Sequence, residues 1–321
     1  METRIKDRFL MKFKKEQTIK TYSIQIDMFY NYVESTLGKK FDNDENLLKS
    51  LSFNLFENYF YYLDRETDYK KATINLKIEV VKEFFDYIIK RKDLGIMEYN
   101  FANTIDQYSQ EEVKKDKKKK YIPTVAEIKR ILDKTYEEKY GTREWEFNSA
   151  RNRFLIALLS STGLRINEAL NINIKDIEMV DNGYMINVDA LGVKNEMNKR
   201  VPIPESIVKY FEEYKIQRMI MNEKFNTDLL FFSIRGNKLD VANVNKALRE
   251  ITGEAGLKEN ISCHCFRHFL TSQLKSKGVD SSMIYKILGW SEKGIDSNYD
   301  GEADDKRYDS IKLKVCNVLM G

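Results

Sequence analysis

Residues 263–268 read CHCFRH and residues 162–170 read TGLRINEAL, and these two stretches carry the most informative chemistry of the chain. The first holds both histidines of the protein, His264 and His268. His264 and Arg267 are three residues apart, so the start of a helix would present both side chains to one ligand. The guanidinium can bind two oxygens of a phosphate while the imidazole donates to another or moves a proton. The pattern therefore predicts a phosphate-binding site.

A metal site is the alternative for the same stretch. Cys263, His264 and Cys265 are all potential ligands. A structural zinc site needs ligands from separated pairs, and the sequence offers no second pair of cysteines or histidines. We therefore expect no metal and no other cofactor, and we expect the two cysteines to be packing residues. Three cysteines in the whole chain also exclude a disulfide framework, which favours the cytoplasm.

The composition is that of a soluble globular protein with room for two domains. Of 321 residues, 42% are hydrophobic and 32% are charged. Only 14 glycines and 3 prolines are present, which favours long helices and excludes collagen-like and loop-rich all-β folds. No apolar stretch approaches the roughly 18 residues of a membrane span, and the N-terminus lacks the apolar region of a secretory signal. We expect a cytoplasmic, nucleoid-associated protein with no membrane partner.

Helical periodicity predicts an N-terminal domain over residues 1–107. Apolar residues spaced by four, three and four predict a helix within 18–34. The aromatic-rich segment 53–63 and the segment 73–90 predict two more helices. Together these helices indicate an antiparallel bundle. Aromatic side chains at this density are expected in a core rather than on a base-stacking surface.

A run of lysines follows the bundle. Residues 114–120 read KKDKKKK, and we call this segment the lysine strap. The strap has a charge of +5 and the whole chain +4, which leaves −1 for the other residues. A basic segment on a near-neutral body indicates either a polyanion partner or a solvated spacer, and the charge alone leaves both open. The whole of 108–120 is expected to be an extended linker.

A second domain is expected over residues 121–321. Thr124 and Glu127 have the spacing of a capping box at a helix start. Alternating apolar residues within 176–203 predict a small antiparallel sheet. The expected helices are at 151–162, ended by Gly163, and at 205–222, 240–252, 265–277, 280–288 and 310–320. The fold class is therefore mainly α with a small antiparallel β-sheet.

Five elements follow one another along this second domain. They are the TGLR segment with Glu168, a hairpin loop with Lys194, the HCFRH segment, Leu288-Gly289-Trp290, and Tyr299. In this order and at this spacing they resemble the tyrosine recombinase (phage integrase) family. The residues Ala72-Thr73-Ile74-Asn75, with the aromatics at 84–87, look like the last helix of that family's core-binding domain. The resemblance covers roughly residues 17–300.

The resemblance implies both a fold and a reaction. A helical core-binding (SAM-like) domain would precede an α/β catalytic domain of the tyrosine recombinase type. The protein would be a site-specific DNA recombinase that uses a 3′-phosphotyrosine and a Holliday junction, for integration or excision of a mobile element or for resolution of DNA. A homotetramer would act on double-stranded DNA with inverted-repeat core sites. The C-terminal tail would pack on the neighbouring protomer or, as the alternative, on its own domain.

The resemblance also implies the functional residues. The implied catalytic set is Arg165, Lys194, His264, Arg267, Trp290 and Tyr299. The implied DNA-binding set is Thr73, Asn75, Lys77, Lys117, Lys118, Lys119 and Lys120.

The chemistry of these residue types agrees with the implied reaction. Cleaving a phosphodiester requires a nucleophile, positive charge beside the non-bridging oxygens and an acid for the departing 5′-oxygen. Tyr299 can supply the nucleophile and become covalently attached. Arg165 and Arg267 can clamp the phosphate, because each is permanently charged and bidentate. Lys194 is the natural acid, with Lys199 in the same hairpin as the alternative.

The remaining residues near the motifs are expected to play supporting roles. His264 can position the phosphate or accept the tyrosine proton. Trp290 can only donate a hydrogen bond and pack. Glu168 is expected to anchor the turn that carries Arg165, and His268 is expected to be structural. One departure is that residues 291–298 lack the paired threonines common before the family's tyrosine, which leaves the helix ends there in doubt.

Two other functions remain open on the sequence. A topoisomerase of the tyrosine type would share the chemistry but relax DNA without sequence preference. A non-catalytic DNA-binding regulator could use the same fold, since fold does not determine function. The complete set of catalytic residue types argues against the regulator.

Overall fold

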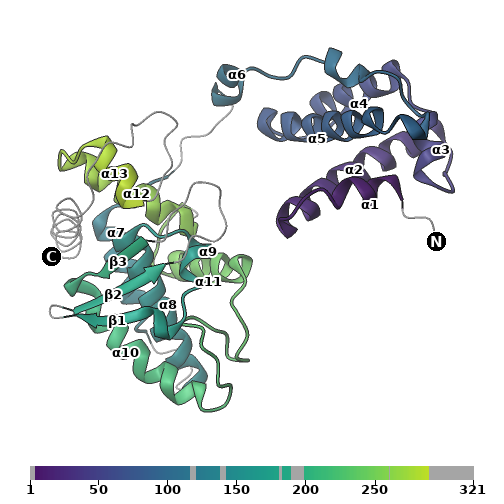
Figure 1. Ribbon diagram of the computed structural model, residues 1–321. Coiled ribbons are helices and arrows are strands. Elements are labelled where there is room, and N and C mark those ends of the chain that lie inside the picture. The colour runs from purple at the N-terminus through teal and green to yellow at the C-terminus, as the bar shows by residue number, and fades with distance from the viewer. Residues whose placement is uncertain are drawn as a thin grey trace, which may run out of the picture. The chain divides into compact units, whose positions relative to one another are not determined.

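The computed structural model describes residues 4–115, 121–137, 142–180, 183–188, 199–259 and 261–288. The chain forms two compact units, Met1–Lys119 and Lys120–Gly321 (Figure 1). Each unit has its own hydrophobic core. Helices dominate both units, and the second unit adds one three-stranded antiparallel sheet, so the expected fold class is confirmed. Within the described ranges, none of the helices is both long enough and apolar enough to span a membrane.

The N-terminal unit is a helical bundle around an aromatic core. Phe29 lies at the centre, with its ring centroid 5.1–5.9 Å from those of Phe56, Tyr59 and Phe85. All four side chains are at most 1% exposed, so the aromatic residues form a core as expected. The elements are α1 (Ile5–Leu10), α2 (Glu16–Leu37), α3 (Asp44–Lys49), α4 (Phe53–Arg65), α5 (Lys71–Lys90), η1 (Lys92–Leu94), η2 (Phe101–Thr104) and α6 (Gln110–Lys115).

The three helices predicted from periodicity in this unit are confirmed as α2, α4 and α5. The short helices α1 and α3 were not predicted, because six residues are too few to show a helical period.

The start of the lysine strap is helical, which corrects the expectation of an extended linker. Lys114 and Lys115 are the last two residues of α6. Ser109 begins this helix: its hydroxyl oxygen accepts a hydrogen bond from the Glu112 N–H at 3.3 Å, and the Glu112 carboxylate accepts one from the Ser109 N–H at 2.8 Å. This reciprocal pair satisfies N–H groups that a helix start leaves open, and it outweighs the repulsion between two neighbouring lysines. Residues 116–120 lie outside the described residues.

The second unit places helices around its small sheet. Its strands are in the order β1-β2-β3, and Ile186 of the central strand stands opposite Ile177 and Val201. The elements are α7 (Val125–Lys134), α8 (Arg143–Thr162), α9 (Ile166–Ala169), η3 (Ile174–Asp176), β1 (Ile177–Val180), β2 (Gly183–Val188), β3 (Lys199–Ile203), α10 (Glu205–Asn222), α11 (Val241–Glu254), α12 (Cys263–Ser276) and α13 (Ser281–Leu288).

Most predictions for this unit are confirmed, including the sheet and the capping box of Thr124 and Glu127. The helix expected at 151–162 is longer, because Thr142 accepts a hydrogen bond from the Trp145 N–H at 3.2 Å and starts α8 at Arg143. The helix expected at 310–320 lies outside the described residues.

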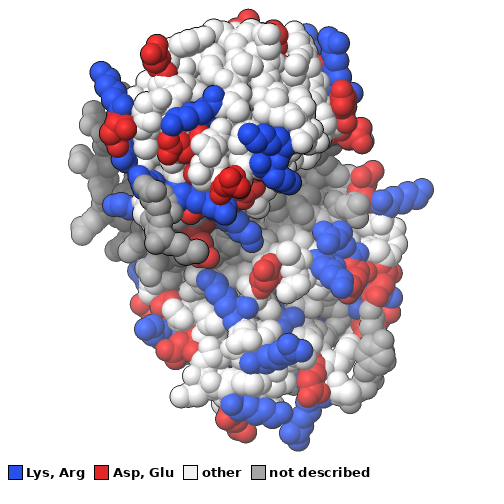
Figure 2. All heavy atoms as spheres, turned by 90° about the vertical axis from the view of Figure 1, so that its right-hand side faces the viewer, with Lys and Arg blue, Asp and Glu red and all other residues white. Residues whose placement is uncertain are grey.

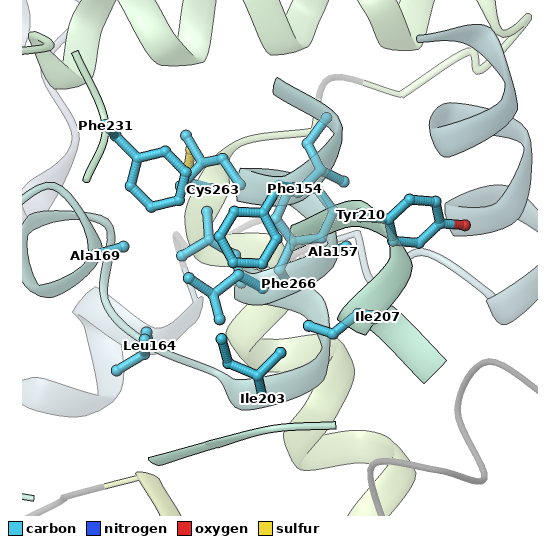
Figure 3. Packing of buried hydrophobic residues seen from close by; sticks show 14 of the residues in the cluster. Phe154, Ala157, Leu164, Ala169, Ile203, Ile207, Tyr210, Phe231, Cys263 and Phe266 are labelled. Carbon is cyan, nitrogen blue, oxygen red and sulfur yellow. The ribbon is translucent and has the colours of Figure 1, made fainter. Parts of the chain in front are cut away.

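Helix α8 is the centre of the second unit. Every residue from Arg153 to Thr162 is buried, so this part of the helix packs on all sides instead of presenting one apolar face. Figure 3 shows Phe154 and Ala157 of α8 among the buried side chains Ile203, Phe231 and Phe266. Because α8 is held from several directions, its C-terminal end is a fixed base for the turn that follows.

Candidate active site and DNA interface

The turn after α8 carries Arg165 and is shaped by Gly163. Gly163 has a φ of 65°, a left-handed conformation that ends the helix. A Cβ atom at this position would lie 2.5 Å from Leu288 Cδ2 and 2.9 Å from Leu270 Cδ2. Glycine is therefore needed here both for its backbone conformation and for the close approach of α12 and α13.

Glu168 fixes the orientation of Arg165. One carboxylate oxygen accepts a hydrogen bond from the Arg165 backbone N–H at 2.7 Å, and the other accepts one from Arg165 Nη1 at 3.0 Å. Glu168 is buried, whereas the Arg165 side chain remains 36% exposed. The expectation that Glu168 anchors this turn is confirmed. The guanidinium is thereby held at the surface, where an anion can reach it.

Arg267 joins three separate motifs. Its side chain is 2% exposed, and its guanidinium donates from Nη1 to the Gly163 carbonyl at 2.7 Å and from Nη2 to the Leu288 carbonyl. Gly163 belongs to the TGLR segment, and Leu288 is the last residue of α13 and the residue before Gly289-Trp290. The structure therefore brings the TGLR segment, the HCFRH segment and Leu288 together at one buried arginine.

His264 lies near the start of α12 with its side chain exposed. His268, one turn later, is half-buried, and the two rings meet edge to face with centroids 4.6 Å apart and planes at 85°. The exposed imidazole is thus on the same short helical segment as Arg267.

The cysteines beside these residues are held by packing. Cys263 is 4% exposed and belongs to the core of the second unit, and burial raises the pKa of its thiol to about 12. Cys265 is half-buried, with its Sγ 3.5 Å from the Ser262 nitrogen. The expectation that both are packing residues is confirmed. Among the described residues, no three His, Cys, Asp or Glu side chains are grouped closely enough to hold a metal ion.

Three members of the expected catalytic set, Lys194, Trp290 and Tyr299, lie outside the described residues. So do Lys117, Lys118, Lys119 and Lys120 of the expected DNA-binding set. Lys199, the alternative to Lys194, begins β3 and pairs with Val188 of β2. Of the catalytic set, the structure describes Arg165, His264 and Arg267, and it connects Arg267 to the carbonyl of Gly163, two residues before Arg165. The other members remain expectations.

The N-terminal residues expected to bind DNA, Thr73, Asn75 and Lys77, all lie on α5 but differ in their surroundings. Thr73 is half-buried in the first turn of α5. Lys77 is 3% exposed, and its amine donates to Gln25 Oε1 at 2.7 Å and lies 3.2 Å from the sulfur of Met28. Burial lowers the pKa of Lys77. Lys77 thus holds α5 against α2, which corrects its expected role as a DNA contact.

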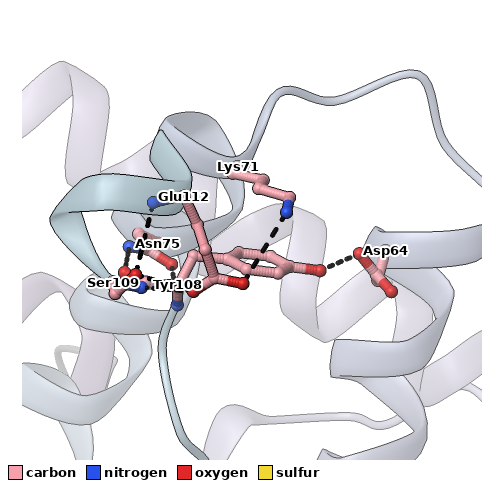
Figure 4. Close-up of polar contacts among 6 residues, drawn as sticks. All are labelled: Asp64, Lys71, Asn75, Tyr108, Ser109 and Glu112. Carbon is pink, nitrogen blue, oxygen red and sulfur yellow. Dashed lines mark hydrogen bonds and ion pairs between the residues drawn. The ribbon is translucent and has the colours of Figure 1, made fainter. Parts of the chain in front are cut away.

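Asn75 also has a structural role that the sequence did not suggest (Figure 4). Its amide donates to the Tyr108 carbonyl at 2.8 Å and its oxygen accepts from the Tyr108 N–H at 3.0 Å. The Tyr108 hydroxyl donates to Asp64, and Lys71 lies 3.8 Å from Glu112. These contacts attach the segment before α6 to α4 and α5, so we remove Asn75 from the proposed DNA contacts. No sequence signal links Asn75 to Tyr108, which lies 33 residues away.

Charge on the described surface is mixed. On the face shown in Figure 2, the described Lys and Arg side chains alternate with Asp and Glu and do not gather in one field. This agrees with the near-neutral charge of the chain outside the strap. The strongest concentration of positive charge in the sequence is therefore the lysine strap.

Comparison with known proteins identifies the family of this chain. Residues 122–305, more than half of the chain, match the phage integrase family, and this range includes all six expected catalytic positions. Tyrosine recombinase XerD of Oceanobacillus iheyensis is 26% identical over 235 residues, which cover 73% of this chain and 72% of that protein.

Two solved structures share the fold. One is XerH site-specific recombinase bound to palindromic difH substrate in a post-cleavage complex, with a TM-score of 0.64, 21% identity and coverage of 93% of this chain and 77% of that chain. The other is a lambda integrase tetramer bound to a Holliday junction, with a TM-score of 0.61, 16% identity and coverage of 92% and 78%. The family match, the shared fold and the convergence of three motifs on Arg267 lead to one conclusion: the chain belongs to the phage integrase family of tyrosine recombinases.

Proposed function

We propose that this protein is a site-specific DNA recombinase that cuts and rejoins DNA through a 3′-phosphotyrosine. The observation that carries the proposal is the position of Arg267, which links the segment of Arg165, the helix of His264 and the residue two positions before Trp290. These bonds support a shared site, because they connect chain segments that each carry an expected catalytic residue.

Each residue has a distinct task in the proposed reaction. Tyr299 attacks the scissile phosphate and displaces the 5′-oxygen, so that the phosphate becomes bonded to the tyrosine oxygen. Arg165 and Arg267 stabilise the charge on the non-bridging oxygens. Lys194 gives a proton to the departing oxygen, with Lys199 as the alternative.

His264 positions the phosphate or accepts the proton of the attacking tyrosine, and Trp290 donates a hydrogen bond and packs beside it. The phosphotyrosine keeps the energy of the broken bond, so religation by a second 5′-hydroxyl needs neither metal nor ATP. Holding Arg165 on Glu168 and Arg267 on two backbone carbonyls preorganises the site, which reduces the reorganisation needed when charge develops.

The wider assembly is part of the proposal. Four copies of the chain would hold two duplexes with inverted-repeat core sites. Strands would then be exchanged between the duplexes through a Holliday junction, in the cytoplasm. The lambda integrase neighbour, whose structure is a tetramer on such a junction, supports this arrangement. Thr73 and Lys117, Lys118, Lys119 and Lys120 remain the proposed DNA contacts, and the C-terminal tail would pack on the neighbouring protomer. The reaction would serve integration or excision of a mobile element, or resolution of DNA.

A nicked suicide substrate tests the nucleophile. The short fragment below the nick diffuses away after cleavage, so the protein stays attached to DNA and migrates as an adduct on a denaturing gel. Tyr299→Phe should bind DNA as the wild type does and form no adduct, because only the attacking oxygen is removed. Tyr308→Phe is the matched control and should form the adduct normally. An adduct in Tyr299→Phe, lost instead in Tyr308→Phe, would move the nucleophile to Tyr308.

A further inference from the structure

The two histidines form a ring pair on one helix. His264 and His268 are four residues apart on α12, with ring centroids 4.6 Å apart and planes at 85°. Helical side chains tilt toward the N-terminus, so the ring of His268 lies over the turn that carries His264. An edge-to-face arrangement is the one that aromatic rings favour, because the positive edge of one ring meets the negative face of the other.

The two rings differ in their exposure to solvent. His264 is exposed near the start of the helix. His268 is half-buried, and its neighbours along the chain, Arg267 and Phe269, are 2% and 1% exposed and fix this part of the helix. The second torsion of a histidine side chain has broad minima, so the contacts of the ring decide its orientation. The contact with the less exposed ring of His268 therefore helps to set the orientation of the exposed ring of His264.

We propose that His268 is a positioning residue that holds the ring of His264 in the orientation required at the scissile phosphate. The proposal rests on the proposed function, in which His264 contacts the phosphate or the attacking tyrosine. A proton-transferring or hydrogen-bonding group must lie about 2.6–3.2 Å from its partner. A ring that is turned away loses this distance, so an oriented imidazole spends more of its time in the reactive geometry. His268 itself makes no contact with DNA in this account.

The alternative is that His268 only fills space in α12. Two substitutions separate the roles. His268→Leu has similar volume but no aromatic ring, whereas His268→Phe keeps the ring and loses the nitrogens. If the ring contact matters, His268→Leu should slow single-turnover cleavage of the suicide substrate by roughly two- to tenfold, the range expected for one aromatic pair, and His268→Phe should stay within roughly twofold of the wild type. DNA affinity should be the same in all three proteins.

A double-mutant cycle tests whether the effect passes through His264. In a His264→Ala background there is no ring to orient, so adding His268→Leu should have no further effect on the cleavage rate. A space-filling role would instead slow both backgrounds by the same factor. Gln273→Leu, at another half-buried position of α12, is the matched control and should leave cleavage unchanged.

The outcomes separate this proposal from the proposed function. Equal cleavage by His268→Leu and the wild type, or an equal loss in both backgrounds, would overturn the positioning role while leaving the recombinase assignment intact. Wild-type cleavage by His264→Ala would overturn the catalytic role of His264 itself. Absence of any adduct with the wild-type protein would overturn the proposed function. Should His268→Leu fail to fold, His268→Gln removes the ring in its place and the same comparison applies.

Discussion

Arg165 and Arg267 are expected to bind the same phosphate, but the fold holds them in different ways. Arg165 is 36% exposed and rests on one carboxylate, Glu168. Arg267 is almost fully buried and binds the backbone carbonyls of Gly163 and Leu288. Removing Arg165 takes away a phosphate partner, whereas removing Arg267 also leaves two buried carbonyls without their donor. Substituting the two arginines should therefore change the stability of the protein by different amounts, even where the two substitutions slow cleavage equally.

Alanine substitutions test this difference. Arg165→Ala and Arg267→Ala should each slow cleavage by on the order of 10² or more, the scale for losing one preorganised charge partner. Arg267→Ala should also lower the free energy of unfolding by about 3 kcal/mol, because an unsatisfied buried polar group costs about 1–3 kcal/mol. Arg165→Ala should cost only about 1 kcal/mol, because the lost partner is partly exposed and Glu168 keeps its hydrogen bond from the backbone N–H of residue 165.

Urea unfolding and cleavage of the suicide substrate measure the two quantities on the same preparations. Equal stability losses in the two variants would contradict the structural role of Arg267. Near-wild-type cleavage by Arg267→Lys would show that the forked guanidinium is not required.

The sequence could identify Arg267 but not its partners. The motif HCFRH marks the residue, whereas its bonds reach Gly163 and Leu288, 104 and 21 positions away. Glu168 was predictable as the anchor of Arg165 because the two are only three residues apart. The roles of Lys77 and Asn75 were not predictable, because their partners lie far away in the sequence. Their bonds to Gln25 and Tyr108 depend on how α2, α5 and the following segment pack, which local spacing does not encode.

At the scale of elements, the end of α8 carries the turn of Arg165 and contacts α12 and α13. Gly163 ends the helix in a left-handed conformation, and the leucines of α12 and α13 pack against it. Long helices such as α2 and α5 were predictable because their apolar period extends over many residues. The short α6 was not, because a run of lysines concealed the Ser109–Glu112 capping pair that begins it.

Gly163→Ala tests the close approach at this helix end. The new Cβ would both strain the backbone and collide with Leu288 and Leu270. Gly278→Ala, in the same unit with a φ of 74° and no atom near the added Cβ, supplies only the strain and is the matched control. Gly278→Ala should cost about 1 kcal/mol, and Gly163→Ala should cost about 1–3 kcal/mol more because of overpacking.

Gly163→Ala should also slow cleavage, since the turn that carries Arg165 must shift. Thermal or urea unfolding gives the stability difference, and the adduct assay gives the rate. Equal destabilisation by the two alanines, with normal cleavage, would show that the contact between Gly163 and Leu288 is not important for the site.

At the scale of the whole molecule, positive charge is concentrated between the two units. The strap has a charge of +5 and the rest of the chain −1. Lys114 and Lys115 belong to α6, which is attached to the N-terminal unit through Asn75 and Tyr108. If both units bind DNA as proposed, the segment that joins them along the chain must cross the phosphate backbone. The spacer interpretation remains the alternative, and salt dependence distinguishes the two.

Replacing Lys117, Lys118, Lys119 and Lys120 by Gln should make DNA binding less dependent on salt. If all four neutralise phosphates, the slope of log K against log salt should fall by about 4, at roughly 0.9 per phosphate. Binding should weaken alike on all sequences, because phosphate contacts carry no sequence information. Binding isotherms across a range of salt concentrations measure the slope. A change below about 1 would support the spacer instead.

The central claim is that this chain exchanges strands between two duplexes at a specific site. DNA captured as the Tyr299 adduct and sequenced supplies that site, and two duplexes with different labels are then built around it. The account predicts joint products that contain both labels, absent with Tyr299→Phe and absent when one duplex lacks the site. Relaxation of supercoiled DNA of any sequence without joint products would instead identify a topoisomerase. Sequence-specific binding without any adduct would identify a regulator, and either result would contradict the account.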